Sequence, residues 1–124
     1  MPAHQPQELH AMFRDAFNRR DLDELFALFE PNATVVVGGE PVAGHGRVRA
    51  ALEQWLAAGG HMSLDTRGVI EGPDGLAVLH GAWTITPSAT AASATVLRGL
   101  STEVARRQRD GTWRFVIDNP ATPI

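Results

Sequence analysis

The sequence predicts an α+β domain, with helices in the first half of the chain and an antiparallel meander of strands in the second. Apolar residues recur at helical spacing as far as Gly59-Gly60, and beyond that point they alternate with polar residues in long runs. Two strong turn sequences, Gly72-Pro73-Asp74-Gly75 and Asp110-Gly111, separate these runs as hairpins. Because no linker or internal repeat interrupts the 124 residues, residues 1–124 are expected to form one domain.

Three segments place their apolar residues on one face of a helix. These residues are Leu9, Met12, Phe13, Ala16 and Phe17, then Leu22, Leu25, Phe26 and Phe29, then Val48, Ala51, Leu52, Trp55 and Leu56. Asp21, with Glu24 three residues later, is typical of a capping box at the start of the second helix. Pro31 is expected to stop the second helix, and Gly59-Gly60 to close the third.

Strands are expected where β-branched and alternating residues replace the helical pattern. A short strand, Thr34 to Val37, runs into a Gly38-Gly39 turn, and longer strands complete the meander. The longer strands span residues 62–71, 76–86, 96–109 and 112–118. The small and polar stretch 87–95 predicts a flexible tip between the middle strands.

The alternation of side chains predicts which of them face the core. In the third long strand it favours Thr102 pointing inward and Glu103 outward. In the last strand it places Phe115 and Ile117 on one face and Asp118 on the other. Both faces of the sheet carry apolar residues, and helices can cover only one of them. We therefore expect a homodimer through the sheet.

Composition excludes several kinds of chemistry. The chain contains no Cys, Lys or Tyr, which removes thiolate nucleophiles, Schiff-base lysines and phenolic proton donors. Its five His residues show no metal-ligand spacing, so we expect no metal site and interpret each His as a surface or interface residue. No phosphate-binding loop is present either, and no cofactor is expected.

Charge and hydropathy narrow the range of partners. The net charge is −3 and the longest basic tract is Arg106-Arg107, which argues against nucleic acid. No apolar run approaches the ~20 residues of a membrane span. The polar N-terminus is not typical of a signal peptide, so a cytoplasmic location is expected.

Motifs distributed over nearly the whole chain resemble those of a known superfamily. They are Phe17 to Leu25, Phe29 to Val35, Gly44 to Leu52 and Asp110 to Arg114. These segments resemble the nuclear transport factor two-like superfamily, and within it the SnoaL-like and ketosteroid-isomerase-like branch. The resemblance implies a cone-shaped roll, in which a strongly curved, mostly antiparallel sheet wraps on three N-terminal helices and leaves a pocket at the end of the core. Because this fold serves isomerases, cyclases, dehydratases and non-enzymatic domains, it does not choose a function.

The ketosteroid isomerases offer a residue-by-residue comparison. Alignment on the motifs places their oxyanion-hole Tyr at Phe13, which has no hydroxyl, and their general-base Asp at Val37. Their protonated Asp falls at Thr102 or Glu103. The alternation turns the Glu103 side chain outward, where it would pair with Arg106 or Arg107. Since proton abstraction beside a ketone needs both a base and an oxyanion donor, ketosteroid isomerase activity is not expected.

Asp118 is the candidate catalytic residue, because the resemblance places its counterpart in the isomerases on the cavity wall. Beside Trp83 it would be desolvated, which would raise its pKa toward that of a useful general base. The alternative is a strand-end carboxylate that accepts hydrogen bonds from the Asn119-Pro120 turn. Arg98 could bind Asp118 or an anionic ligand group, or it could be a solvated strand residue.

Aromatic side chains supply the candidate pocket wall. Phe13, Phe17, Trp55 and Trp83 could enclose a flat or cyclic ligand, although ordinary core packing would bury them as well. In this fold the pocket is the end of the core, so both interpretations can hold. The other candidate substrate-binding residues are Val37, Arg98, Thr102 and Val116.

Two functional hypotheses follow. The first is a small enzyme that binds a small apolar, cyclic metabolite, with isomerase, cyclase or dehydratase chemistry at Asp118. The second is a non-catalytic ligand-binding module or a dimeric interaction module, favoured by the missing isomerase base and phenol. The residues alone leave both open.

Overall fold

Three helices lie in the first half of the chain, as the sequence predicts. The computed structural model describes residues 2–88 and 95–121, so residues 89–94 of the predicted flexible tip lie outside the described part. The helices are α1 (Glu8–Asn18), α2 (Leu22–Ala27) and α3 (His45–Ala58). None of the helices within the described ranges is long and apolar enough to cross a membrane.

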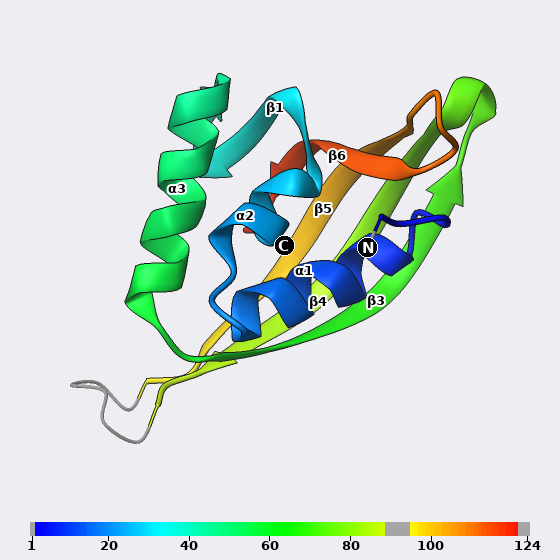
Figure 1. Ribbon diagram of the computed structural model, residues 1–124. Helices are drawn as coiled ribbons and strands as arrows, with labels where there is room; N and C mark the ends of the chain where they lie inside the picture. The colour runs from blue at the N-terminus through cyan, green and yellow to red at the C-terminus, as the bar shows by residue number, and fades with distance from the viewer. Residues whose placement is uncertain (1, 89–94, 122–124) are drawn as a thin grey trace.

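The strands form one mixed, mostly antiparallel sheet. They are β1 (Phe29–Val37), β2 (Glu40–Ala43), β3 (His61–Glu71), β4 (Leu76–Thr86), β5 (Leu97–Arg107) and β6 (Trp113–Asn119). Their order is β2-β1-β6-β5-β4-β3, and only the β1–β6 pair is parallel. The sheet curves around the helices without closing, which gives the cone expected from the sequence (Figure 1).

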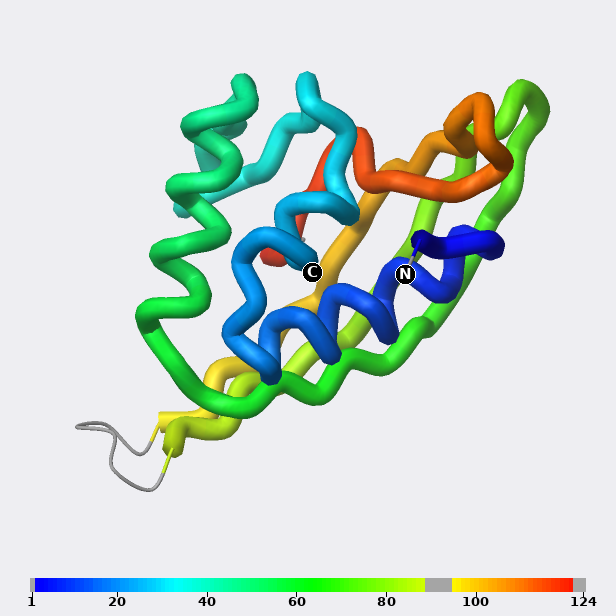
Figure 2. The backbone as a smooth tube through the Cα atoms, viewed as in Figure 1, coloured from blue at the N-terminus to red at the C-terminus, as the bar shows by residue number. Residues whose placement is uncertain are grey.

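The core fills the space between the concave face of the sheet and the helices. α1 lies along β3, α3 packs on β1, and α2 contacts both other helices (Figure 2). From α1, the apolar stripe predicted by the sequence contributes Leu9, Phe13, Ala16 and Phe17, all of them buried. Phe13 meets Phe29 and Phe115 edge-on, with ring centroids 6.4 and 6.3 Å away. These aromatic contacts fix the helices on the sheet.

Two local predictions in the first half of the chain are wrong. The second helix ends at Ala27, before Pro31, and Phe29 already belongs to β1. Phe29 pairs with Phe115, and Pro31 falls in the irregular stretch of the β1–β6 pairing, where its missing N–H costs no ladder bond. The sequence reading also missed β2, which pairs with β1 across the predicted Gly38-Gly39 turn.

The predicted faces of β5 are reversed in the structure. Glu103 is buried and points inward, while Thr102 lies on the outer face. The reason is cross-strand register, because directly opposite residues share a face. Glu103 lies opposite Leu79, which is fully buried, and Thr102 lies opposite His80 on the exposed side.

An irregularity in β6 turns Asp118 toward the core. The β5–β6 register shifts between the pairs Val104–Ile117 and Ala105–Phe115, so one residue of β6, Val116, is left over. Such a bulge reverses the alternation beyond it. As a result Phe115 and Asp118 both face inward. Ile117 is 42% exposed and faces outward, so the prediction that it shares a face with Phe115 is wrong.

Candidate functional site

A cavity of about 610 Å³ occupies the open end of the cone. It extends from the end of α3 and the adjoining ends of β4 and β5 inward to α1 and β6. Its volume lies in the range of small-molecule sites. The side chains along its length are mostly apolar or aromatic, and they include Phe13, Phe17, Trp55, Met62, Leu64, Trp83, Ile85, Leu97 and Phe115.

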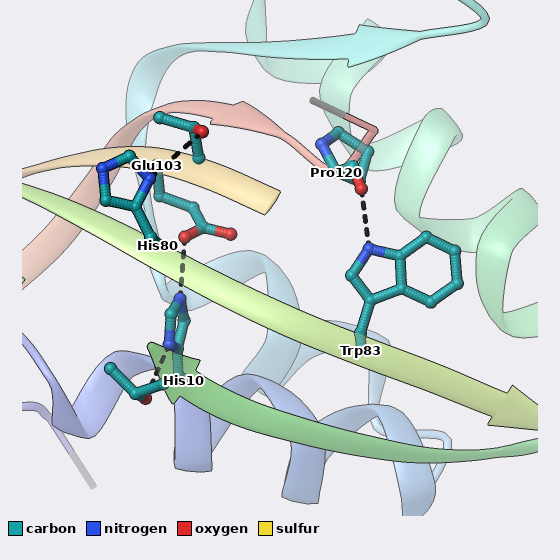
Figure 3. A network of polar contacts seen from close by, with 7 residues as sticks. His10, His80, Trp83, Glu103 and Pro120 are labelled. Atoms are coloured by element: carbon teal, nitrogen blue, oxygen red, sulfur yellow. Dashed lines mark hydrogen bonds and ion pairs between the residues drawn. The ribbon is translucent and has the colours of Figure 1, made fainter. Parts of the chain in front are cut away.

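The four aromatic residues singled out from the sequence all line this cavity. Trp83 is held by two local features of the sheet. Its indole Nε1–H donates a hydrogen bond to the Pro120 carbonyl at 2.6 Å (Figure 3). Its ring also lies against Gly99, where an added Cβ would come within 2.4 Å of the ring. The glycine therefore leaves room for a fixed aromatic wall.

Two carboxyl groups lie on the cavity wall, on neighbouring strands. Asp118 of β6 and Glu103 of β5 are direct cross-strand partners, and both are about 5% exposed or less. Burial raises the pKa of Asp118 well above its ordinary value, and the negative charge of Glu103 raises it further. Asp118 therefore keeps its proton at pH values where an exposed Asp is ionised.

His10 holds the Glu103 carboxylate from the helix side. It lies on α1 and is 2% exposed, with Nε2 2.7 Å from Glu103 Oε1. Its other ring nitrogen, Nδ1, lies 2.8 Å from Thr66 Oγ1 of β3. Figure 3 shows the imidazole standing between α1 and the sheet, directed at Glu103. The buried carboxylate is thus paired on one side and faces a second carboxyl on the other.

The sequence places Asp118 near the cavity, where it lies, but it does not point to Glu103 or His10 as cavity residues. The sequence analysis interprets His10 as a surface or interface residue, yet it precedes Phe13 by three positions and Phe17 by seven, which places it on the same buried helix face. That spacing was a usable signal. No comparable local signal identified Glu103, because the face of β5 depends on its pairing with β4.

Four predicted substrate-binding residues do not lie on the cavity wall: Val37, Arg98, Thr102 and Val116. Arg98 is exposed, which fits its solvated alternative. Thr102 lies on the outer face, with Oγ1 3.4 Å from His80 Nδ1. In the described part of the chain, no group of three or more His, Asp or Glu side chains is placed to hold a metal ion.

The cone and the order of its elements are those of the nuclear transport factor two-like fold. Within that class the chain belongs to the SnoaL-like domain family, whose model matches residues 9–116. The match spans nearly all of α1, all of α3 and most of the sheet, and α1 and α3 are the helices that line the cavity. A search among curated proteins found no sequence match.

Solved structures show the same fold at low sequence identity. A Streptomyces avermitilis protein named "putative dehydratase from the NTF2-like family" is 17% identical, with a TM-score of 0.77 over 97% of this chain and 95% of that one. A ketosteroid isomerase-like protein from Erwinia carotovora atroseptica is 18% identical, with a TM-score of 0.71 over 94% of each chain. An NTF-2 like protein of unknown function from Shewanella oneidensis is 16% identical, with a TM-score of 0.78 over 94% and 95%.

Proposed function

We propose that this protein is an enzyme that transfers a proton on a small, mostly apolar, cyclic metabolite bound in the cavity. The observation that supports it most is the Glu103–Asp118 pair of buried carboxyls on a mostly apolar wall. Pairs of acids whose surroundings separate their protonation states are typical of acid–base sites. The aromatic wall suits a flat ring, which it would orient against the two carboxyls.

The two carboxyls take different roles in this proposal. The protonated Asp118 donates a hydrogen bond to a carbonyl oxygen of the metabolite. Glu103, held by His10, accepts a proton from the neighbouring carbon, and the negative charge that forms on the oxygen is stabilised by Asp118. Return of the proton to another carbon completes an isomerisation, and its transfer to a departing hydroxide completes a dehydration. The Streptomyces and Erwinia proteins are named after the same two kinds of reaction, dehydration and isomerisation.

The general base and the phenol of the ketosteroid isomerases have no counterpart here, although Glu103 is one of the two positions where the resemblance places their protonated Asp. Phe13 lies on the cavity wall without a hydroxyl, and Val37 is not a wall residue. The proposed site instead combines β5, β6 and α1 through Glu103, Asp118 and His10. We therefore propose proton transfer without proposing steroid isomerisation.

Deuterium incorporation tests this function without knowledge of the natural substrate. The probes are 1-tetralone and 2-cyclohexen-1-one, incubated with the protein in D2O and followed by NMR at the carbon beside the carbonyl. We expect exchange above the buffer rate, reduced by about 10²-fold or more in Asp118→Asn and Glu103→Gln. Arg14→Gln, an exposed change on α1, should exchange like the wild type. Exchange no faster than buffer, or unaffected by both carboxyl variants, would overturn the proposal.

A second candidate function is a non-catalytic, dimeric module, and one observation favours it. The outer face of the sheet carries an apolar patch formed by Ile70, Val78, Val104 and Ile117, which lie in register across four strands, with Leu100 farther along β5. We infer that a second copy of the chain covers this outer apolar patch, as the sequence predicted. Ligands that stabilise the wild type and Asp118→Asn equally, with no deuterium exchange by either, would favour binding and assembly over catalysis.

A further inference from the structure

The imidazole of His10 spans three strands of the sheet. Its Nδ1 reaches Thr66 on β3 and its Nε2 reaches Glu103 on β5, so the ring crosses over β4. At the crossing point β4 carries Gly81, which pairs with Thr66 on one side and Ser101 on the other. A Cβ at Gly81 would lie 3.1 Å from His10 Cε1. The missing side chain leaves space for the ring against the sheet.

The two ends of this network lie in different environments. Glu103 is buried on the cavity wall, whereas Thr66 is exposed on β3, the edge strand of the sheet. The β3–β4 register shifts directly after Thr66, between Thr66 and Gly68. The chain of hydrogen bonds therefore runs from a buried carboxyl, through a buried imidazole, to a hydroxyl at the surface.

A ligand in the cavity would lie between Glu103 and the open end of the cone. A proton taken up by Glu103 would then need another way to exchange with water. The groups that face Glu103 are His10 from α1 and Asp118 from β6. Of these, only His10 makes a hydrogen bond that leads to an exposed residue among the described contacts of the pair.

We propose that His10 and Thr66 form a proton path between the Glu103 carboxyl and bulk water. Its use during turnover rests on the proposed function. Release starts from the Nδ1–H tautomer of His10, in which Nε2 accepts the hydrogen bond of the protonated Glu103 carboxyl. Glu103 then gives its proton to His10 Nε2 while the Nδ1 proton passes to Thr66 Oγ1, and the hydroxyl proton of Thr66 passes to water. The imidazole is left as its other tautomer, hydrogen-bonded to the Glu103 carboxylate. Uptake follows the same steps in reverse.

The path can be tested on the ligand-free protein, with water as the only probe. In protein labelled with ¹⁵N-histidine, NMR measures the exchange of the His10 ring N–H with water, and the signal is assigned by its loss in His10→Gln. We expect this proton to exchange much faster than the buried backbone amide of Phe13 on the same helix. Thr66→Val, which keeps the shape and removes the hydroxyl, should slow the exchange several-fold. Thr66→Ser, which keeps the hydroxyl, should retain the wild-type rate.

Three results would overturn the path. The first is a His10 ring N–H that exchanges as slowly as the Phe13 amide, and the second is a ring N–H that exchanges in Thr66→Val at the wild-type rate or faster. The third is a ring N–H whose exchange is slowed in Thr66→Ser as much as in Thr66→Val. The wild-type comparison holds even where a variant folds poorly. Because no ligand is present, the outcome is independent of the tetralone experiment. A Thr66-dependent exchange in a protein that does not deuterate 1-tetralone would remove the proposed function and leave the path.

Discussion

Asp118 reaches the cavity because of one extra residue in β6. Without the bulge at Val116, the alternation that starts at Phe115 would turn Asp118 to the outer face, where a carboxylate is solvated and keeps its ordinary pKa. Inside, the same group lies beside Glu103 and away from water. A change of backbone register by one residue thus changes the chemistry that the side chain can perform.

The raised pKa of Asp118 makes the stability of the protein depend on pH. Since the folded pKa lies above the unfolded value near 3.8, the folded state binds this proton more tightly. Its stabilising contribution is full below about pH 3.8 and is lost as pH rises through the folded pKa. Asp118→Asn cannot ionise, so its free energy of unfolding should exceed that of the wild type increasingly toward about pH 8. Urea unfolding across this range measures the difference, and a pH-independent difference would contradict it.

Gly81 is the residue on which the position of His10 depends. In Gly81→Ala the new Cβ would press on His10 Cε1 and on Ser101 Oγ, which lies 2.7 Å from the Cβ position. We expect a loss of about 1–3 kcal/mol in the free energy of unfolding, measured by urea titration. Gly46→Ala is the control, because Gly46 is in α3 with nothing within 4 Å of an added Cβ. A neutral Gly81→Ala would show that the ring has room to move.

At the scale of elements, the end of α1 is tied to the start of β3. The amide of Asn18 donates to the Met62 carbonyl at 3.0 Å and accepts from the Met62 N–H at 2.8 Å. This two-way hydrogen bond fixes the strand that begins at the cavity, which Met62 lines. Asp21 likewise caps α2, as the sequence predicted, by accepting a hydrogen bond from the Glu24 N–H at 3.0 Å.

Removal of the tie between α1 and β3 should destabilise the protein. Asn18→Ala leaves both partly buried backbone groups of Met62 without their partner, which costs about 1–3 kcal/mol. Thermal or urea unfolding measures the loss. Arg14→Ala, an exposed change on the same helix, should stay within about 0.5 kcal/mol of the wild type. Equal losses in the two variants would mean that the tie contributes nothing specific.

At the scale of the whole molecule, the helices cover only one face of the sheet. The outer apolar patch includes Leu100, which is 41% exposed, and Ile117. Burial of such a surface against a second copy stabilises an assembly through the hydrophobic effect. The helices therefore leave the opposite face of the sheet uncovered, and the proposed dimer would bury it.

A charged substitution in the outer apolar patch tests the proposed dimer. Light scattering at micromolar concentration should give a dimer mass for the wild type and a monomer mass for Leu100→Glu, since a charge would be buried in the interface. Gln54→Glu, at an exposed position on α3 and so on the opposite side of the sheet, should remain a dimer. A monomeric wild type would defeat the prediction.

Sequence reasoning succeeded where the pattern is local. The stripe through Leu9, Phe13 and Phe17 predicted α1, and Asp21 with Glu24 predicted the start of α2. The fold resemblance predicted that Asp118 would lie near the cavity. The placement of Glu103 failed, because the apolar residues of β5, such as Leu100 and Val104, gave the outer face the more hydrophobic pattern.

Local patterns in the sequence predict three helices, most of the strands and the aromatic side chains available to a pocket, and the composition excludes phenol, thiol and lysine chemistry. Tertiary structure alone decided which polar side chains meet. Glu103, Asp118 and His10 come from β5, β6 and α1, and their meeting depends on strand register and on the bulge in β6. These features arise from pairing between segments distant in sequence, so periodicity within any one segment cannot specify them.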